Sequence, residues 1–435
     1  MGGICGVFNF ATGKPADSAA VKRATDAMAH RGPDDEGAGM QNKKPAVCII
    51  IENLPVPMDR RVWQESRALR DAGYRVSVIC PKARGFERSR ETLEGIEIYR
   101  YRVWEASGPV GYVAEYALAL AAQFRLALRV YARTRFRVLQ ACNPPDTIFL
   151  IGLFFKLFGV RFVFDHHDLN PELYEAKFGQ RDFGYKLVCW AERLTFRSAD
   201  VSIATNESYR EVARLRGNMR SECVFVVRSC PDLERMRKRP PRPELKEGRR
   251  YLAVYLGVMG PQDGLELLLE SIALIVHGSK RQDILFVLIG AGTEIPRLKV
   301  LAAAKGLEPL VRFNGRLPDE EVAAYFSTAD VGVAPDPATP MNDKSTMNKI
   351  LEYMAFGLPV VLYDLTEGRR SAGGGALYAR PSDPEDFARQ ILKIIDSESL
   401  RRELGECSRR RIEEGLNWES EKRSLLEAYE TALAL

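Results

Sequence analysis

Apolar segments of strand length alternate with segments of helix length from residue 46 almost to the end of the chain. Strands are expected at 46–51, 75–80, near 138, near 162, and at 251–256, 284–289, 311–314, 331–334 and 359–363. Helices are expected between them, including 61–72 and a long helix within 112–133. This alternation is typical of the β-α-β units that build a parallel, doubly wound sheet, so the sequence predicts an α/β fold.

A chain of 435 residues is too long for a single hydrophobic core, so we expect two domains. The stretch 238–250 is rich in Pro, Arg, Lys and Glu, a composition typical of an exposed connection. The prediction is a Rossmann-like domain at 45–240, completed by the C-terminal helix 412–435, and a second at 248–411. Residues 1–44 would form a short extension. Two such domains are expected to bind a ligand in a cleft where the strands of both sheets end.

The charge balance is mildly basic, with 63 Lys and Arg against 58 Asp and Glu and a formal net charge of +5. This suits an anionic substrate or a membrane surface and is too weak to indicate nucleic acid. Eight cysteines show no CxxC or metal-ligand spacing, which is typical of reduced packing residues in a cytoplasmic protein. No signal peptide is visible, and the longest apolar run, 148–155, stops at Lys156, well short of a membrane span.

The segment 342–361, NDKSTMNKILEYMAFGLPVV, is predicted to form a helix that leads into a buried strand. Ser345 or Thr346 would cap the helix and Gly357 would end it. The free N–H groups of a helix start suit a diphosphate, with Lys349 as an added charge. Glu352 lies on the same side and could accept hydrogen bonds from ribose hydroxyls. The alternative is an ordinary amphipathic helix with an exposed Lys/Glu pair.

A second group of polar residues, Asp165, His166, His167 and Asp168, follows the strand expected near 162. Ligands of α/β proteins bind at this end of the strands. The alternatives are a turn in which an aspartate caps the next segment, and a zinc cluster, which is weaker because no further ligand shows suitable spacing nearby.

Taken together, six segments resemble glycosyltransferase family 4, the "group 1" retaining enzymes of the two-domain GT-B architecture. They are LPVPMDRRVWQESRALRDAGYRVSVICP, ACNPPD, FDHHDLNPELY, ATNESY, GVMGPQDGLELLL and STMNKILEYMAFGLPVV. The resemblance covers residue 45 to the C-terminus. It implies transfer of a sugar from a nucleotide-diphosphate donor with retention, and no bound metal or other cofactor.

The family pattern D-x-H-D-x-x-P-E falls on Asp165, His167, Asp168, Pro171 and Glu172. The resemblance implies that His167 lies beside the donor sugar, and it makes His167 and Asp168 the candidate catalytic residues. In the family pair E-x7-E, the second glutamate holds the ribose and the first touches the sugar. The second position is Glu352.

This sequence departs from the family at the donor site. Lys344, next to Asp343, stands where the family has the first glutamate. Val258 and Asp263 replace the Arg and Lys that commonly grip the diphosphate in the loop after Gly257. We therefore expect the diphosphate to be held by the other candidate residues. These are the Gly257 loop, Ser345, the helix start at Thr346, Met347 and Asn348, Lys349, and Arg60 or Arg61 from the other domain.

The acceptor side is predicted from the helix within 112–133, where Arg125, Arg129 and Arg133 recur every four residues. This basic stripe could rest on anionic lipid, or it could be a solvated face of a core-packed helix. With the apolar run 148–155, it is consistent with a lipid-linked or glycan acceptor and with peripheral contact at the inner face of a membrane.

Residues 1–39 contain GGICGVFNF and DAMAHRGPDDEG, which resemble the start of the glutaminase domain of asparagine synthetases. That family needs a cysteine directly after the initiator methionine, because its freed amine activates the thiol. Gly2 stands there, and Cys5 stands where the family has a small residue. We interpret the segment as a truncated remnant without ammonia chemistry.

The leading hypothesis is thus a glycosyltransferase that uses a nucleotide-sugar donor and does not bind nucleic acid. The alternatives are a nucleotide-sugar epimerase, a catalytically silent nucleotide-sugar-binding protein, and a glutamine amidotransferase.

Overall fold

The computed structural model describes residues 44–104, 109–234 and 236–435, and residues 45–435 form one compact unit. The segment that resembles a glutaminase domain lies outside the described residues, and its interpretation stays a prediction.

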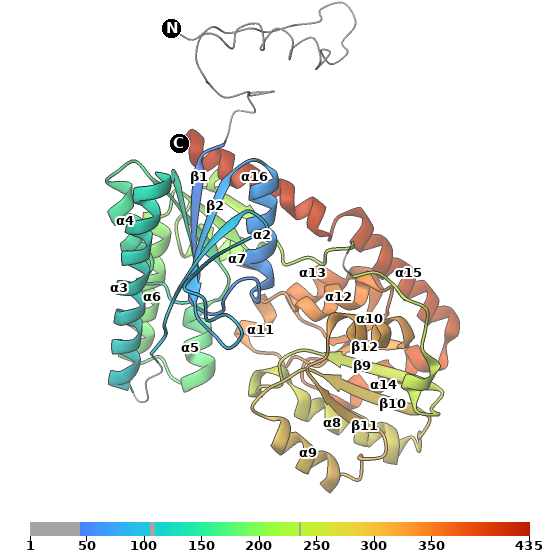
Figure 1. Cartoon of the computed structure of the whole chain (residues 1–435). Helices are drawn as coiled ribbons and strands as arrows, with labels where there is room; N and C mark the ends of the chain where they lie inside the picture. The colour runs from blue at the N-terminus through green and yellow to red at the C-terminus, as the bar shows by residue number, and fades with distance from the viewer. Residues whose placement is uncertain (1–43, 105–108, 235) are drawn as a thin grey trace, which may run out of the picture. The chain divides into compact units, whose positions relative to one another are not determined.

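The first domain is built on a sheet of eight strands, of which Figure 1 labels β1 and β2. The strands are β1 (Ala46–Ile50), β2 (Arg75–Pro81), β3 (Arg90–Leu93), β4 (Ile96–Tyr101), β5 (Val138–Cys142), β6 (Arg161–His166), β7 (Val201–Ala204) and β8 (Val224–Val226). Their order is β3-β4-β2-β1-β5-β6-β7-β8, and every pair is parallel except β3–β4. The sequence analysis did not predict β3, β4, β7 or β8. RETL of β3 is mostly polar and lies at the edge of the sheet, and β7 and β8 have only four and three residues.

Helices cover both faces of this sheet. They are α2 (Arg60–Asp71), α3 (Pro109–Thr134), α4 (Phe149–Lys156), α5 (Asn170–Phe178), α6 (Phe183–Ser198), α7 (Glu207–Leu215) and α16 (Trp418–Ala434). Side chains alternate along a strand, so Val47 and Ile49 pack with α2 and α16, whereas Cys48 and Ile50 pack with α3 and α4. The fully buried β1 is therefore apolar at every position, as expected for a central parallel strand.

The C-terminal helix α16 is part of the first domain's core, although it follows the second domain in the chain. Leu425 and Tyr429 are fully buried among residues of β1, β2 and α2. The hydroxyl of Tyr429 donates a hydrogen bond to the side-chain oxygen of the buried Gln140 on β5.

We predict that Tyr429→Phe lowers the free energy of unfolding by about 1–2 kcal/mol, because the buried oxygen of Gln140 loses a donor that no water replaces. Urea denaturation followed by circular dichroism measures this. Tyr131→Phe is the matched control, since the Tyr131 ring packs on Phe136 and Phe155 and its hydroxyl donates to no described residue. An equal loss in both variants would contradict the assignment.

The second domain is built on a sheet of six strands, all parallel. The strands are β9 (Tyr251–Leu256), β10 (Ile284–Ile289), β11 (Val311–Gly315), β12 (Val331–Ala334), β13 (Val360–Tyr363) and β14 (Ala376–Ala379), in the order β11-β10-β9-β12-β13-β14. Its helices are α8 (Leu265–Ala273), α9 (Ile295–Ala304), α10 (Asp319–Thr328), α11 (Pro340–Lys344), α12 (Asn348–Ala355), α13 (Thr366–Ala372), α14 (Pro384–Asp396) and α15 (Glu398–Glu414). Two Rossmann-like parallel domains confirm the predicted fold class.

Glycines bring two loops of the second domain together at the ends of β9 and β10. Gly290 has φ +144°, and a Cβ on it would lie 1.8 Å from the carbonyl oxygen of Gly257. Only glycine tolerates this approach, so Gly290 has a packing reason that is independent of any phosphate.

Candidate functional site

His167 belongs to a buried polar network at the C-terminal end of β6. The Asp165 carboxylate accepts hydrogen bonds from Nη2 of Arg61 at 2.8 Å and from Nε2 of Gln140 at 2.9 Å. Oδ2 of Asp165, which accepts from Gln140, also lies 2.7 Å from Nε2 of His167. The backbone N–H of His167 donates to the side chain of Asn143, just beyond β5, at 2.7 Å. Neighbouring strand ends thus hold the imidazole in one orientation.

Arg61 belongs to this network and not to the place predicted for it. Its side chain is 8% exposed and also donates to the backbone oxygen of Val227 at 2.7 Å. The guanidinium is surrounded by carboxylates of its own domain, Asp165 and Glu65. The expectation that Arg61 reaches a diphosphate is therefore wrong, because its hydrogen-bonding groups are engaged inside the first domain.

The network shifts the pKa values of both Asp165 and His167. Burial would raise the pKa of Asp165, but Arg61 and His167 hold it well below its usual range. Burial would lower the pKa of His167, but the charge and hydrogen bond of Asp165 outweigh this and raise it above its ordinary value. With Nε2 engaged by Asp165, Nδ1 is the ring atom available to a ligand.

The neighbouring histidine has a different environment. His166 is fully buried between the rings of Phe164, Phe196 and Tyr209, and burial lowers its pKa to about 3. It is a neutral packing residue. Asp168 is partly exposed just beyond the end of β6. Burial raises the pKa of Asp168, the charge of His167 opposes this, and the charge of Asp59 adds to it.

A possible metal cluster also meets here, because β5 places Cys142 beside Asp165 and His167 with ligand atoms within 4.8 Å of one another. Sequence spacing did not reveal Cys142, which lies on a different strand. The donor set suits a cation poorly, since burial raises the pKa of the Cys142 thiol well above its ordinary value and Arg61 already occupies the Asp165 carboxylate.

In the second domain, the loop before α12 differs from the prediction that Ser345 or Thr346 caps the helix. TPMNDK forms the short helix α11, with Thr339 as its cap, so Ser345 comes at its end and donates to the backbone oxygen of Met341 at 2.8 Å. Thr346 accepts a hydrogen bond at 3.1 Å from Asn206 of the first domain. The residue preceding α12 is Met347, which has no capping side chain, so the first N–H groups of the helix, from Asn348 on, have no side-chain cap.

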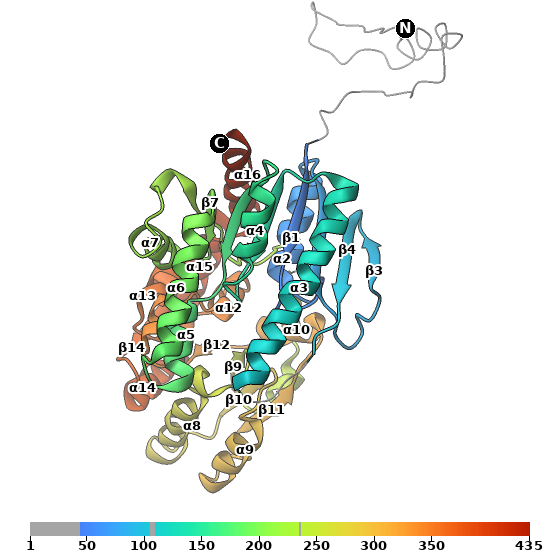
Figure 2. The ribbon, with the colours of Figure 1, turned by 90° about the vertical axis from the view of Figure 1, so that its left-hand side faces the viewer.

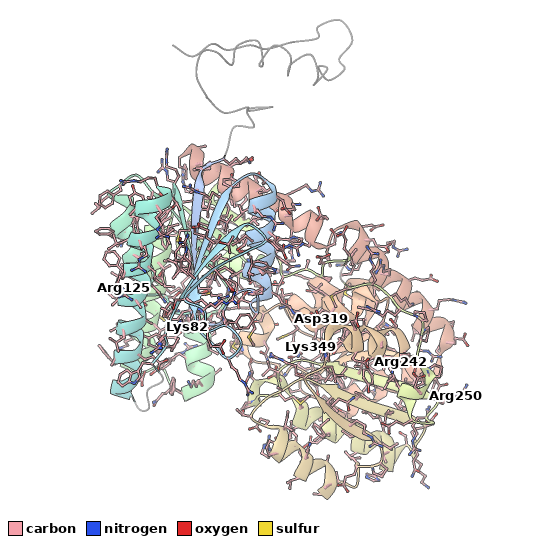
Figure 3. All side chains as sticks on the ribbon, viewed as in Figure 1. Lys82, Arg125, Arg242, Arg250, Asp319 and Lys349 are labelled. Carbon is pink, nitrogen blue, oxygen red and sulfur yellow. The ribbon has the colours of Figure 1, made fainter. Side chains whose placement is uncertain are left out.

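Lys349, labelled in Figure 3, lies in the first turn of α12. Its side chain is buried and forms an ion pair. Its ammonium donates to Asp336, just beyond β12, at 2.8 Å and lies 4.8 Å from the ring centre of Tyr255. The alternative of an exposed Lys/Glu pair is therefore wrong for Lys349. Its side chain also lies against the loop at Gly257, where a Cβ would be 3.3 Å from Cε of Lys349. Because Asp336 balances its charge, Lys349 attracts a diphosphate less than a free lysine would.

Arg60 and Glu352 join the two domains. Nη1 of Arg60, in the first turn of α2, lies 3.7 Å from Oε1 of Glu352 on α12, and Nη2 donates to Asp319 on α10 at 2.6 Å. The Arg60 side chain is 58% exposed and that of Glu352 is 18% exposed. The junction thus brings together two of the predicted donor residues.

Lys344 also joins the domains. Its ammonium lies 3.0 Å from Glu172 of α5, which Arg216, directly after α7, also contacts at 2.9 Å. Asp343 accepts from the backbone of Thr366 at 2.8 Å. The lysine that replaces the family's first glutamate is therefore matched by a carboxylate of the first domain, a pairing of residues 172 positions apart that sequence reasoning did not reveal.

Two parallel Rossmann-like domains, with strand ends of both near one junction, define the GT-B class of fold. Residues 58–228 match the family described as "Glycosyl transferase 4-like domain", and residues 250–397 match "Glycosyl transferases group 1". The chain belongs to this glycosyltransferase family, as its six motifs predicted.

Relatives and solved structures agree with this placement. A D-inositol 3-phosphate glycosyltransferase of Corynebacterium jeikeium is 27% identical over 213 residues, which are 47% of this chain and 49% of the relative. The chain spans about half the length of the curated relatives it matches first. Sucrose-phosphate synthase from Thermosynechococcus elongatus has 19% identity and a TM-score of 0.74, over 90% of this chain and 100% of that one. HepE of Anabaena in complex with UDP-glucose has 15% identity and a TM-score of 0.69, over 89% and 100%. At these identities the solved structures show the fold alone.

Proposed function

We propose that the chain transfers a sugar from a nucleotide-diphosphate donor to a glycan or lipid-linked acceptor, with retention and without a bound metal. The observation that carries this is the position of Glu352. It lies on the second helical turn of α12, 3.7 Å from Arg60 of the other domain. A ribose held by Glu352 would have its diphosphate toward the start of α12 and its sugar toward the first domain.

In this proposal, charge develops on the departing diphosphate and needs positioned donors. The first N–H groups of α12 supply one set. Arg60 supplies a second, because its guanidinium is more than half exposed and can exchange Asp319 for a phosphate. His167, oriented by Asp165, then contacts the sugar. The shared fold with HepE, solved in complex with UDP-glucose, supports a uridine nucleotide as the first donor to test.

A second candidate function is nucleotide-sugar binding without transfer. It is favoured by the pairing of Lys349 with Asp336 and by Lys344 in the position of a sugar-binding glutamate. Turnover of a nucleotide sugar with a panel of acceptors separates the two functions.

Nucleotide binding is tested by thermal-shift titration with UDP, GDP, ADP and CMP compounds. We expect Glu352→Ala to abolish the shift produced by the best binder, because the ribose loses its charged acceptor. Glu320→Ala is the matched control, since Glu320 on α10 is 80% exposed and its ion-pair partner within the described part of the chain is Arg239. An undiminished shift in Glu352→Ala would place the nucleotide elsewhere.

A further inference from the structure

The described helices α3, α4 and α6 lie side by side on one face of the first sheet (Figure 2) and expose large apolar side chains. On α6, Phe183 is 82% exposed and Trp190 57%, and directly after α4 Leu157 is 81% exposed. The apolar face, as we call it, comprises Leu150, Leu153, Leu157, Phe158, Phe183, Leu187 and Trp190. Among the described residues of the second domain, by contrast, the exposed large hydrophobics are Val258, Leu274 and Val300, which are scattered. A contiguous apolar patch on a surface indicates a partner.

Helix α6 carries apolar side chains on its outer side as well as its inner one. Phe183, Leu187 and Trp190 recur at helical spacing on the outer side, whereas the buried inner side combines Phe196 with the polar Glu192 and Thr195. A helix that only covers a sheet places its apolar residues inward. The outer side of α6 is therefore suited to an apolar environment other than the protein's own core.

The charged side chains of these three helices are mostly basic. Lys186, Arg193 and Arg197 are exposed on α6, at helical spacing from Phe183 and Trp190. Arg125 and Arg129 are exposed on α3, where the basic stripe was predicted. Within the described part of the chain, none of these five cations has an ion-pair partner. The acidic residues of these three helices are Glu115 and Glu192, of which Glu192 is buried against Arg216.

We propose that the apolar face and its flanking cations dock on a bilayer that contains anionic phospholipid. Exposed Trp, Phe and Leu with Lys and Arg is the composition that binds at the boundary of head groups and acyl chains. No described helix is long and apolar enough to cross a membrane, so the chain would lie on the surface. A second copy of the chain fits poorly, since a twofold contact through this face would bring like charges together.

Membrane docking extends the proposed function and rests on it, because docking serves transfer only if the acceptor is linked to a lipid. Helices α4 and α6 both run from the edge where β5 and β6 end to the opposite edge, so Leu150 and Phe183 lie toward the edge that carries His167. An acceptor with a lipid anchor in the bilayer would thus present its head group near the candidate site.

Vesicle flotation of the full chain tests the proposal. We expect binding to vesicles of phosphatidylcholine with phosphatidylglycerol, and much weaker binding to phosphatidylcholine alone or at high salt. Phe183→Ser/Leu187→Ser/Trp190→Ser should lower partitioning at least about tenfold, because three inserted apolar side chains are lost. Lys186→Gln/Arg193→Gln/Arg197→Gln should remove the dependence on anionic lipid. The control Leu274→Ser/Val300→Ser removes exposed apolar side chains of the second domain and should bind as the unaltered chain does.

Three results would overturn docking: no flotation of the unaltered chain, undiminished flotation of the Phe183, Leu187 and Trp190 variant, or a stable dimer that this variant dissociates. Circular dichroism and thermal denaturation show that the variants are folded. Loss of nucleotide binding in Glu352→Ala with unchanged flotation supports both proposals. Flotation without any nucleotide binding by the unaltered chain contradicts only the proposed function.

Discussion

Replacing Asp165 by alanine is expected to lower the free energy of unfolding by about 3–5 kcal/mol, because it leaves a buried arginine without its counter-charge. Arg61 has little exposure, and its remaining carboxylate, Glu65, cannot fully compensate, since burial raises the pKa of Glu65 and disfavours its charged form. Gln140 and His167 also lose an acceptor. Chemical denaturation at neutral pH measures the change.

The pH dependence supplies an independent readout. The pKa of Asp165 is lower in the folded chain than its ordinary value of 3.8, so the ionised carboxylate stabilises the fold above that value. This contribution to the free energy of unfolding is lost as the pH falls below the ordinary pKa. The Asp165→Ala variant has no such contribution, so its stability should fall less on acidification. Glu175→Ala, which breaks the exposed contact with Arg181, is the control and should leave stability unchanged. Equal stability of Asp165→Ala and the unaltered chain would show that the buried network does not hold the strand ends.

His167→Ala is expected to lower the rate of transfer by about 100-fold to 10,000-fold, the range over which a positioned histidine contributes. Nucleotide affinity should stay within about twofold, since the proposed nucleotide contacts come from α12 and Arg60. The measurement is single-turnover transfer beside a nucleotide titration.

A pH profile separates a role at the sugar from a structural one. Because Asp165 raises the pKa of His167, Asp165→Asn should move any pH dependence due to His167 toward lower pH. His277→Ala, which alters an exposed histidine hydrogen-bonded to the backbone oxygen of Lys305, should transfer at the unaltered rate. Full turnover by His167→Ala would discard the assignment.

Local patterns were sufficient to predict much of the fold. β1, β9 and β10 are buried on both faces and read as continuous apolar runs, and the amphipathic α2 begins where Asp59 accepts from the backbone of Val62. The strands β3, β4, β7, β8 and β14 were not predicted, and all of them except β4 have only three or four residues, too few to show a clear period. The position of His167 followed from its place after a strand.

The partners of the site residues could not be predicted. Arg61 with Asp165 and Lys344 with Glu172 are pairs separated by more than 100 residues, and no local spacing encodes them. Lys349 was expected to serve a ligand, yet it pairs with Asp336, whose position follows only once β12 is placed beside β9. The cap assigned to Ser345 was wrong since α11 uses the preceding residues as a separate turn.

The return of α16 to the first domain means that the chain crosses between domains twice, after β8 and before α16. The crossings are neighbours, since the backbone N–H of Trp418 donates to the oxygen of Pro231 at 3.3 Å and Glu421 accepts from the backbone of Arg228 at 2.8 Å. Two adjacent connections allow the domains to rotate about the line that passes through both connections, and they resist rotation about other axes. Relative motion of the two domains would then be a rotation about these connections, and it would have to separate Arg60 from Glu352 and Lys344 from Glu172.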